Sequence, residues 1–568
     1  MDKKTIIRTL ERIALLMELQ GENPFKVSAF RKAAQTLELD SRSLSEMDDP
    51  TKLKGIGAAT GGVITDLIQD GESSLLLELE KQVPQGLVEM LQIPGMGGKK
   101  IARLHAELGI ETLEGLREAC EKNEVQALAG FGKKTEEKIL KELDQLASRP
   151  DRYPIWKLEP IVEHIESLLH NHQNVNKASV AGSFRRTKET SKDLDFVIAT
   201  DHVEAVKEML KASLEIEEMI ADGDTKMSVS LAKPERVDVD FRFVVESEFA
   251  TTLHHFTGSK DHNIRMRQLA KEKDWKISEY GVEKEDGTVT TYASEAEFFA
   301  DFDLPFIPPS VRETGQELDR LNELKNLVQL EDIVSDLHMH TTWSDGAHSL
   351  EEMIEGCTAK NYKLMVITDH SRYLRVANGL TPERLREQNQ KIKELQKNYP
   401  DIHILSGTEM DILPDGTLDF DDELLAELDF VIASIHSSFS QPQEKIMERL
   451  FAAVSNPHVD MIAHPTGRIV GEREGYEPDV EQLLQWAKEY DKIVELNANP
   501  YRLDLAVPWL ERAQEFGVKV AINTDAHHLD HLRFMDIGVR HAQKAWLTKE
   551  TIVNTWEPKK FLDYLSRK

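Results

Sequence analysis

Asp193 and Asp195 lie two residues apart at the start of an apolar run, and their side chains have the types and spacing for metal chemistry. In a strand, residues two apart point to the same face, so the two carboxylates would project together while Leu194 packs on the opposite face. Carboxylates this close repel each other unless a cation lies between them. Hard oxygen ligands of this kind suit Mg²⁺, which usually shares its site with substrate phosphates.

The residues before this pair favour a phosphate site beside the metal. Gly182 and Ser183 form a small-residue turn, and Ser183 and Arg186 offer a hydroxyl and a guanidinium that can hold phosphate oxygens. A lone Asp-x-Asp is more often a solvated acidic strand edge. The turn and the arginines that precede this one favour the functional interpretation.

These residues together resemble a known catalytic signature. The pattern is similar to the nucleotidyltransferase signature of the family X DNA polymerases, and its members here are Gly182, Ser183, Arg186, Asp193 and Asp195. The resemblance implies that the two aspartates bridge two Mg²⁺ ions, and that Ser183 and Arg186 bind the triphosphate of an incoming dNTP.

That family needs a third carboxylate on a neighbouring strand. Asp238 and Asp240 are the candidates, because the alternating segment 236–243 puts both on one face. Downstream, the segment 256–259 resembles the sugar-contacting turn of the family, and the family's spacing from that turn leads to Asp240. We therefore expect Asp240 to complete the catalytic and metal-binding set, with Asp238 as the alternative.

The resemblance extends to groups that hold the nucleotide and the new base pair. Phe256 and Gly258 match residues that contact the incoming sugar, and Asn263 and Arg267 match residues that reach the minor groove. His255 stands where the family has a tyrosine. The dNTP site implied in this way consists of Gly182, Ser183, Arg186, Phe256, Gly258 and Asn263.

Beyond residue 333, apolar strand, polar ending and helix alternate repeatedly. Such a rhythm predicts a parallel β/α barrel, with seven strands as the alternative to eight. Barrel chemistry lies at the carboxyl ends of the strands. The apolar runs that read as strands are 333–337, 364–368, 430–434, 461–463, 493–496 and 518–522.

Histidines and carboxylates gather at these strand ends. One strand-end histidine is more often a hydrogen-bonded structural residue, but five strand ends and an adjoining loop that all supply nitrogen or carboxylate ligands indicate a metal centre. Mixed imidazole and carboxylate ligation suits Zn²⁺, Mn²⁺ or Fe²⁺. The residues are His338, His340, Asp345, Asp369, His370, Glu409, His436, His464, Asp525 and His527.

This set resembles that of the PHP domain, named for polymerase and histidinol phosphatase. The resemblance implies up to three metal ions, here Mn²⁺ or Zn²⁺, and an active site, because every ligand position has a competent residue. Asp369 is expected to orient a ligand from outside the metal shell. The implied ligands are His338, His340, Asp345, His370, Glu409, His436, His464, Asp525 and His527.

Three Gly-x-Gly turns, each before a helical segment, resemble helix-hairpin-helix motifs. Such a turn lets backbone N–H groups approach a phosphate, and a helix N-terminus adds its positive end. One such turn is weak evidence, but three, two of them followed by paired lysines, favour sequence-independent contact with the DNA backbone. The expected DNA contacts are Gly55, Gly57, Gly95, Gly97, Lys99, Lys100, Gly130, Gly132, Lys133 and, further on, Arg267.

The first segment resembles the amino-terminal domain of polymerase beta, in which a lysine nucleophile removes sugar-phosphate remnants. The position of that lysine is Val63 here, with Ala59 one turn earlier. A Schiff base needs an amine. We therefore expect this domain to bind a 5′-phosphate with little lyase activity, unless another lysine such as Lys54 serves.

Composition limits the class of protein. The length of 568 residues suggests three to five units, and a hydrophobic content of 40% is enough for globular cores. No apolar run approaches 18 residues, so we expect no membrane span. Two cysteines fit a reducing cytoplasm. The formal net charge of −31 means that DNA must be held by local basic patches and backbone amides.

Together these resemblances predict a multidomain chain: α-helical helix-hairpin-helix domains, an α/β nucleotidyltransferase palm, an α+β thumb and a C-terminal (β/α)7-type PHP barrel. The expected limits are 1–85 for the 5′-end-binding domain, 86–150 for the second helix-hairpin-helix domain, 151–248 for the palm, 249–315 for the thumb, 316–332 for a linker and 333–568 for the PHP domain.

The function implied is that of a DNA-directed DNA polymerase that fills short gaps in base excision repair. A metal-dependent 3′-5′ exonuclease in the barrel accompanies it, with AP endonuclease activity as an open question. The expected partners are gapped or nicked double-stranded DNA with a 5′-phosphate and dNTPs, with no membrane, for a cytoplasmic monomer that associates with the nucleoid on DNA. Two alternatives are a small-molecule phosphoesterase and a non-catalytic DNA-end scaffold.

Overall fold

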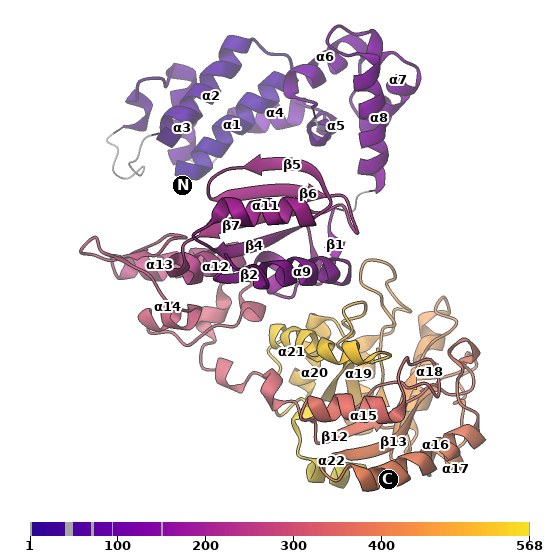
Figure 1. Cartoon of the computed structure of the whole chain (residues 1–568). Helices are drawn as coiled ribbons and strands as arrows, with labels where there is room; N and C mark the ends of the chain where they lie inside the picture. The colour runs from indigo at the N-terminus through magenta and orange to yellow at the C-terminus, as the bar shows by residue number, and fades with distance from the viewer. Residues whose placement is uncertain (1–2, 40–48, 70–72, 94, 149–150, 567–568) are drawn as a thin grey trace. The chain divides into compact units, whose positions relative to one another are not determined.

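The computed structural model describes residues 3–39, 49–69, 73–93, 95–148 and 151–566. The chain forms two compact units, residues 1–150 and 151–568, which are coloured indigo to purple and purple to yellow in Figure 1.

The first unit is helical, as the sequence predicts. Its core collects the apolar positions that recur at helical spacing, such as Ile6, Leu10, Ile13 and Met17, all of which are buried. Its helices are α1 (Lys3–Leu19), α2 (Pro24–Leu39), α3 (Ala58–Gln69), α4 (Ser74–Gln82), α5 (Gln85–Glu89), α6 (Gly98–Leu108), α7 (Leu113–Glu121) and α8 (Lys133–Ser148).

All three Gly-x-Gly turns have one geometry. A 3₁₀ turn (η2 Pro50–Lys52, η3 Met90–Gln92 and η4 Val125–Ala127) precedes each, and α3, α6 or α8 follows it. The first glycine of each turn has a positive φ, at +120° for Gly55, +83° for Gly95 and +88° for Gly130. This conformation suits glycine because it has no Cβ. Pro94 of the second turn lies outside the described residues.

The second unit begins with a five-stranded mixed sheet. Its strands run in the order β2 (Lys177–Val180), β4 (Asp193–Ala199), β7 (Asp238–Val244), β6 (Lys226–Leu231) and β5 (Ile216–Asp222). Helices α9 (Ile155–His170) and α11 (Val203–Ser213) pack on the face that carries Leu194, Phe196 and Phe241. The short strands β1 (Tyr153–Pro154) and β3 (Thr190–Ser191) pair beside this sheet. The apolar run that starts at Asp193 and the alternating segment 236–243 predict β4 and β7, but the β5–β6 hairpin is not predicted from the sequence.

The small residues 180–183 also read as a strand in the sequence, but the strand β2 ends at Val180. Gly182 has a φ of +62°, which an extended strand cannot accommodate, and it opens the single helical turn α10 (Gly182–Arg185). The turn leaves the sheet just where β4 brings Asp195 alongside, so the small residues serve close approach to a neighbouring strand.

A small α+β subdomain follows the sheet. Ser259 caps α13 by accepting a hydrogen bond from the backbone N–H of His262 at 3.1 Å, which separates α13 from α12. The elements are η5 (Glu246–Glu248), α12 (Phe249–Thr257), α13 (Lys260–Glu272), the antiparallel strands β8 (Lys276–Ile277), β9 (Val282–Glu283) and β10 (Val289–Thr290), α14 (Glu295–Asp301) and η6 (Pro309–Val311).

The stretch 316–332 contains three 3₁₀ turns. These are η7 (Gln316–Asp319), η8 (Leu324–Asn326) and η9 (Leu330–Asp332). Leu318, Leu324 and Leu327 pack into the core of the preceding subdomain, while Val328 packs into the barrel core. The connection is therefore held at both ends by buried side chains.

The barrel has seven strands in sequential parallel order, which confirms the sevenfold alternative. They are β11 (Ser335–Asp336), β12 (Leu364–Ile367), β13 (His403–Asp411), β14 (Phe430–Ser434), β15 (Met461–Ile462), β16 (Ile493–Asn497) and β17 (Lys519–Asn523). The edges approach each other beyond β11 and β17, where the His340 N–H donates to the Ala526 carbonyl at 2.8 Å. β13 is not among the apolar runs from which strands are predicted in the sequence.

Helices surround these strands (Figure 1). Buried apolar side chains line both the strands and the helices that cover them, in the pattern of a packed parallel barrel. The helices are α15 (Leu350–Ala359), α16 (Pro382–Leu395), α17 (Asp422–Leu425), α18 (Gln443–Ser455), α19 (Val480–Glu489), α20 (Val507–Phe516), α21 (Phe534–Lys544) and α22 (Pro558–Leu565), with 3₁₀ turns η10 (Arg375–Ala377), η11 (Gln396–Asn398), η12 (Leu529–Arg533) and η13 (Val553–Thr555).

Candidate active sites

The parallel pairing of β4 with β7 brings four carboxylates together. Asp193 lies opposite Asp238, and Asp195 lies opposite Asp240. Because side chains alternate along a strand, all four project from the same face, while Leu194 and Val239 point into the core. Each predicted catalytic aspartate therefore lies in this cluster, and so does the alternative, Asp238.

The electrostatics of this cluster favour a cation. Burial raises the pKa of Asp195 to about 7, and the negative charges of Asp193 and Asp240 add to the shift. Burial also raises the pKa of Asp193, again with Asp240 as the first contributing charge. Lys226 on β6 pairs with Asp240, with Nζ 2.8 Å from Oδ2. Lys192 and Arg242 also act on Asp193 and Asp195, but the pKa of both carboxyls stays raised, so divalent ions would relieve the remaining repulsion.

Gly182 and Ser183 lie against the cluster. A Cβ on Gly182 would be 2.4 Å from the Asp195 Oδ2. The Ser183 hydroxyl is hydrogen-bonded to that of Ser191. The turn thus approaches the carboxylates as expected, and the role of Ser183 in phosphate binding stays a prediction.

Arg186 is nine-tenths buried and has partners of its own. Its Nη1 donates to the Thr257 carbonyl at 2.5 Å, and its Nε donates to Glu313 at 3.3 Å. Glu313 also binds Lys544 of the barrel at 2.6 Å. Arg186 therefore joins the sheet domain to the next subdomain in this structure, and a triphosphate would compete with Glu313 for it.

The residues expected around the sugar and base lie on α12 and α13. The Arg242 guanidinium lies 4.7 Å from the centre of the Phe256 ring, a cation–π contact. Asn263 donates to the His255 carbonyl at 2.7 Å, which fixes its side chain, and Arg267 is exposed on α13. Gly258 has a φ of +67° beside Arg186. The structure brings these residues to one region, and their substrate contacts stay predictions.

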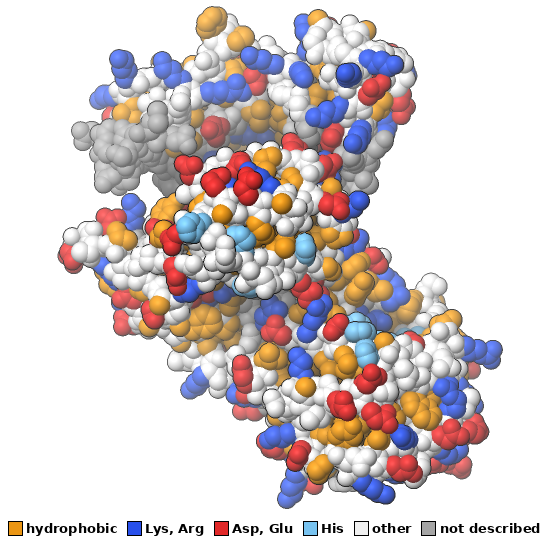
Figure 2. All heavy atoms as spheres, in the orientation of Figure 1, with side chains coloured by type: hydrophobic (Ala, Val, Ile, Leu, Met, Phe, Trp, Pro, Cys, Tyr) orange, Lys and Arg blue, Asp and Glu red, His pale blue; other side chains and the backbone are white. Residues whose placement is uncertain are grey.

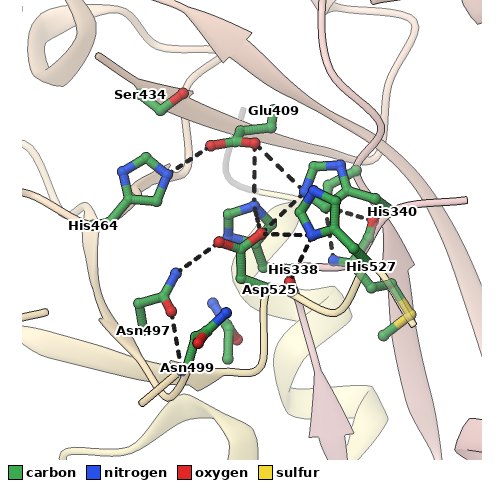
Figure 3. Close-up of polar contacts among 12 residues, drawn as sticks. His338, His340, Glu409, Ser434, His464, Asn497, Asn499, Asp525 and His527 are labelled. Carbon is green, nitrogen blue, oxygen red and sulfur yellow. Dashed lines mark hydrogen bonds and ion pairs between the residues drawn. The ribbon is translucent and has the colours of Figure 1, made fainter. Parts of the chain in front are cut away.

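A second centre lies at the carboxyl ends of the barrel strands (Figure 3). Glu409 is its hub, because three imidazoles approach its Oε2: the Nδ1 of His370 at 2.9 Å, the Nε2 of His338 at 3.3 Å and the Nε2 of His340 at 3.5 Å. Its Oε1 lies 3.1 Å from His436 and 2.9 Å from His464.

The remaining predicted ligands complete the centre. Asp525 Oδ1 lies 3.2 Å from the Nε2 of His340, and Asp345 Oδ1 lies 3.4 Å from the Nε2 of His527. Three overlapping groups have ligand atoms close enough to share a metal: His340, Asp345, His370 and His527; His338, His340, Glu409 and Asp525; and His370, Glu409 and His436. Among the described residues, His464 joins none of these groups and adjoins them through Glu409.

These residues fit metal ions. The Oε2 of Glu409 and the Nε2 of His338 are buried, and although imidazole nitrogens lie 2.9–3.5 Å from this Oε2, neither atom has a partner in hydrogen-bonding geometry within the described part of the chain. Buried lone pairs without a partner are costly, and a cation would satisfy them. His464 and Asp525 hold left-handed backbone conformations, with φ of +26° and +51°. Such strain is typical of functional sites.

Without a cation, the charges of the centre shift its titration. Burial lowers the pKa of His338, but Asp525, Glu495 and Glu409 outweigh that effect and raise the pKa well above its usual value. Likewise, burial opposes but Glu409 dominates in raising the pKa of His436 to about 10. Metal binding must therefore displace protons from these imidazoles.

Two carboxylates that sequence reasoning missed orient these ligands. Glu495 Oε1 lies 2.7 Å from the Nδ1 of His338, which leaves the Nε2 of that ring for a metal. Asp411 Oδ1 lies 3.2 Å from the Nδ1 of His436. Glu495 is fully buried within the apolar strand β16, and a carboxylate in such a run was the available signal.

Asp369 acts on the loop that carries the predicted ligand Asp345 and not on a ligand imidazole. Asp369 accepts hydrogen bonds from Thr341 (2.7 Å), Ser344 (2.5 Å) and Gln388 (2.5 Å), and no contact with a ligand imidazole is present among the described residues. Asp369 therefore holds the loop that carries Asp345. The reason is local, because that loop folds back over Asp369 and uses both carboxylate oxygens.

The sheet domain contacts the barrel loops beside the metal centre. The Trp156 ring stacks on Tyr501 with centroids 4.1 Å apart, and its Nε1 donates to the Val470 carbonyl at 3.1 Å. Arg468 pairs with Glu189 at 2.7 Å. These contacts hold the loop that begins at the predicted ligand His464.

Comparison with known proteins extends over the whole chain. The chain is 55% identical over 568 residues to a Bacillus subtilis (strain 168) protein named DNA polymerase/3′-5′ exonuclease PolX, with 100% of both chains covered. The chain belongs to the family X DNA polymerases that carry a C-terminal PHP domain.

Matches to individual families place the parts of this polymerase. Residues 1–73 match a helix-hairpin-helix domain, 87–145 a SAM-like helix-hairpin-helix tandem, 252–313 the DNA polymerase beta thumb and 336–499 the PHP domain. The predicted fold class is thereby confirmed. A polymerase with a PHP domain depends on divalent metals and binds DNA.

The PHP part is also similar to smaller proteins. A probable phosphatase of Thermoanaerobacter sp. (strain X514) is 30% identical over 247 residues, which are 42% of this chain and 96% of that protein. A probable phosphatase of Caldanaerobacter subterraneus subsp. tengcongensis is 30% identical over 236 residues, or 39% of this chain and 87% of that protein.

The surface is of mixed charge. Figure 2 shows Asp and Glu side chains interspersed with Lys and Arg over the visible face. Within the part of the chain that the structure describes, no helix is long and apolar enough to cross a membrane.

Proposed function

We propose that the protein is a gap-filling DNA-directed DNA polymerase of base excision repair, whose PHP domain is a 3′-5′ exonuclease. The observation that carries the proposal is the presence of two complete acidic centres in one chain. Asp193, Asp195 and Asp240 cluster on the palm, and the predicted PHP ligands gather in overlapping groups around Glu409 and Asp345.

At the palm, Asp193, Asp195 and Asp240 would hold two Mg²⁺ ions, which lower the pKa of a primer 3′-hydroxyl and neutralise the triphosphate. The residues around them position the substrates. Gly182 has no Cβ and so allows the Asp195 carboxylate to lie close to the turn, and Ser183 can donate its hydroxyl hydrogen to a phosphate oxygen. We propose that Phe256, Gly258 and Asn263 contact the nucleotide, and that Arg186 leaves Glu313 to bind the triphosphate.

At the PHP centre, the nine predicted ligands would hold up to three Mn²⁺ or Zn²⁺ ions, which neutralise a phosphodiester oxygen and lower the pKa of a water nucleophile. The protein's part is to aim the ligand nitrogens at the metal. Glu495 and Asp411 do so for His338 and His436 by binding the opposite nitrogen of each ring.

We propose that the helical unit binds gapped or nicked DNA through its three hairpins. Lys99 and Lys133 are exposed at the starts of α6 and α8, where backbone N–H groups already favour phosphate. Val63 is buried in the helical core, and no amine occupies that position, which supports weak lyase activity. The full set of proposed contacts is Gly55, Gly57, Gly95, Gly97, Lys99, Lys100, Gly130, Gly132, Lys133 and Arg267.

We also propose domain limits of 1–85, 86–150, 151–248, 249–315, 316–332 and 333–568, and a monomer in the cytoplasm that joins the nucleoid on DNA.

A second function, hydrolysis of small phosphomonoesters, is favoured by the similarity of the PHP part to probable phosphatases. It leaves the palm carboxylates without a role.

Incubation with a one-nucleotide gapped duplex, the matching dNTP and Mg²⁺ tests the polymerase. Asp195→Ala should abolish extension while DNA binding survives, and Asp201→Ala, an exposed palm aspartate, is the matched control. Full extension by Asp195→Ala would show that Asp195 is not a catalytic residue of the polymerase.

The exonuclease has its own test. His338→Ala combined with His340→Ala should stop degradation of a 3′ end and leave extension intact. His403→Ala, an exposed histidine at the start of β13, serves as the control. Degradation that survives the double substitution would place the nuclease elsewhere.

A further inference from the structure

A loop rich in arginine rises directly from the PHP metal centre. Residues 371–380 follow the predicted ligand His370, and the chain returns at Leu380, whose N–H donates to the His370 carbonyl at 2.7 Å. Ser371 and Leu380 form a β-bridge across the base. Gly379 has no space for a side chain there, because a Cβ would lie 1.9 Å from the Ser371 carbonyl oxygen. The loop is thus closed tightly at its base.

This loop touches the segments beside two other predicted ligands. Asn378 donates to the Trp343 carbonyl at 3.1 Å, two residues before Asp345. The Oγ of Ser437, which follows His436, lies 3.5 Å from the Tyr373 hydroxyl. The loop therefore forms part of the rim of the metal centre.

A groove of about 800 Å³ runs along this loop. Its walls are Arg372, Tyr373, Arg375, Asn378, Thr381 and Arg384, with Asp419 and Gly379. Three arginines against one aspartate make it cationic, in a chain whose net charge is −31. Such a local cluster is what a strongly acidic protein needs to hold a nucleic acid.

The three arginines of the groove differ in how firmly contacts within the protein hold their side chains. Arg372 pairs with Asp419 at 3.2 Å, and Arg384 donates to the Trp343 carbonyl at 2.5 Å, so these two brace the groove. Arg375 is exposed and forms no ion pair with another described residue. Beside it, Tyr373 is 39% exposed and Val376 is 95% exposed. A free guanidinium next to an accessible aromatic ring is the combination that binds a phosphate and stacks a base.

We propose that loop 371–380 is a platform for the single-stranded 3′ end of DNA, on which Arg375 binds a backbone phosphate and Tyr373 stacks a base. This inference rests on the proposed exonuclease and names the feature that selects DNA over small phosphate esters. Arg375 and Tyr373 are positioning residues for the strand, since neither lies among the metal ligands.

Steady-state degradation of a 5′-labelled single-stranded oligonucleotide by the full chain with Mn²⁺ tests the platform. Arg375→Ala should raise KM about tenfold with little change in kcat, and should flatten the salt dependence by about one phosphate contact. Tyr373→Ala should raise KM similarly, and Tyr373→Phe should restore it because the ring face remains. Hydrolysis of bis(4-nitrophenyl) phosphate should be unchanged in all three.

Arg386→Ala is the matched control, because Arg386 lies on α16 outside the groove and pairs with Glu427 at 2.8 Å. The platform is overturned if Arg375→Ala and Tyr373→Ala leave KM for DNA at the wild-type value. It is equally overturned if they slow the small diester as much as DNA, since they would then act on the metal centre.

Photocrosslinking separates this inference from the proposed exonuclease. A single-stranded oligonucleotide with 5-iodouracil at its 3′ end, bound with Ca²⁺ in place of Mn²⁺, should crosslink to the peptide that contains Tyr373. Wild-type protein that crosslinks there but degrades neither DNA nor the small diester would refute the nuclease and keep the platform. Absence of the crosslink in a protein that degrades DNA would refute the platform alone.

Discussion

Gly182 and Asp195 are so close that a Cβ on the glycine would lie 2.4 Å from the carboxylate Oδ2. Real Cβ atoms do not approach oxygen at that distance, and the φ of +62° adds strain for any other residue. Gly182 therefore sets where the predicted catalytic carboxylate can point.

Gly182→Ala should lower the rate of nucleotide incorporation by about 100-fold, because a 1 Å misplacement in an active site costs that much. Single-turnover extension of a gapped primer is the measurement. Gly223→Ala is the control, since its φ is not positive and its Cβ would meet only the Lys226 carbonyl at 3.7 Å. Equal rates for the two variants would contradict the argument.

Asp240 and Asp238 are distinguished by their register. Asp240 lies directly opposite Asp195, and its charge helps to raise the pKa of both Asp195 and Asp193, whereas Asp238 contributes only at Asp193. Asp240→Asn should therefore reduce kcat for extension by about 100-fold or more, and Asp238→Asn by only a few fold. The opposite order in the same gapped-primer assay would assign the third carboxylate to Asp238.

The sequence predicted those site residues whose positions follow from the alternation of side chains along a strand or from the place where a strand ends. Alternation places Asp193 and Asp195 on one face, and apolar runs with polar endings place His338, His436 and Asp525 at strand ends, whatever the distant parts of the chain do. These patterns depend only on neighbouring residues, so the folded structure keeps the positions that they predict.

The parts that it missed depend on distant contacts. Glu313 binds Arg186 across 127 positions of sequence, and Glu495 binds His338 across 157. No local pattern encodes such pairs. The β5–β6 hairpin was not predicted for another reason. Most of β5 is exposed, so its sequence lacks the apolar run that is typical of a buried strand.

A buried chain of hydrogen bonds in the thumb predicts acid sensitivity. The Nε2 of His254 lies 3.0 Å from the Nε2 of His262, whose Nδ1 lies 2.7 Å from Glu317. Only one of the two facing Nε2 atoms can carry a proton, because two N–H groups would otherwise point at each other. Burial lowers the pKa of His254 well below 6.5, and burial also lowers that of His262.

Both histidines are therefore neutral when folded and become protonated near pH 6.5 when unfolded. Their contribution to stability is present above pH 6.5 and is lost as the pH falls below it, at up to about 1.4 kcal/mol per pH unit for His254. Thermal unfolding of the full chain between pH 7.5 and 5 should show this decline. His254→Phe should flatten it relative to His164→Phe, an exposed control. Parallel curves for the two variants would exclude the thumb histidines.

Glu495 is the carboxylate that aims His338. Its Oε1 lies 2.7 Å from the His338 Nδ1 and also accepts from Asn523 at 3.0 Å, while its Oε2 accepts from the backbone N–H of His464 at 2.7 Å. One fully buried side chain thus fixes two predicted ligands. Loss of such a partner commonly weakens metal binding by about 10- to 100-fold.

Glu495→Gln should keep the hydrogen bond through the amide oxygen but lose the charge, and Glu495→Ala should lose both. Manganese affinity measured by calorimetry on the full chain should fall in the order wild type, Gln, Ala. Extension at the palm, which uses other ligands, should stay at the wild-type rate. Glu481→Gln, an α19 surface residue paired with Arg512, is the control and should bind manganese normally. Unchanged affinity in Glu495→Ala would mean that the ring of His338 is held by its packing and not by this carboxylate.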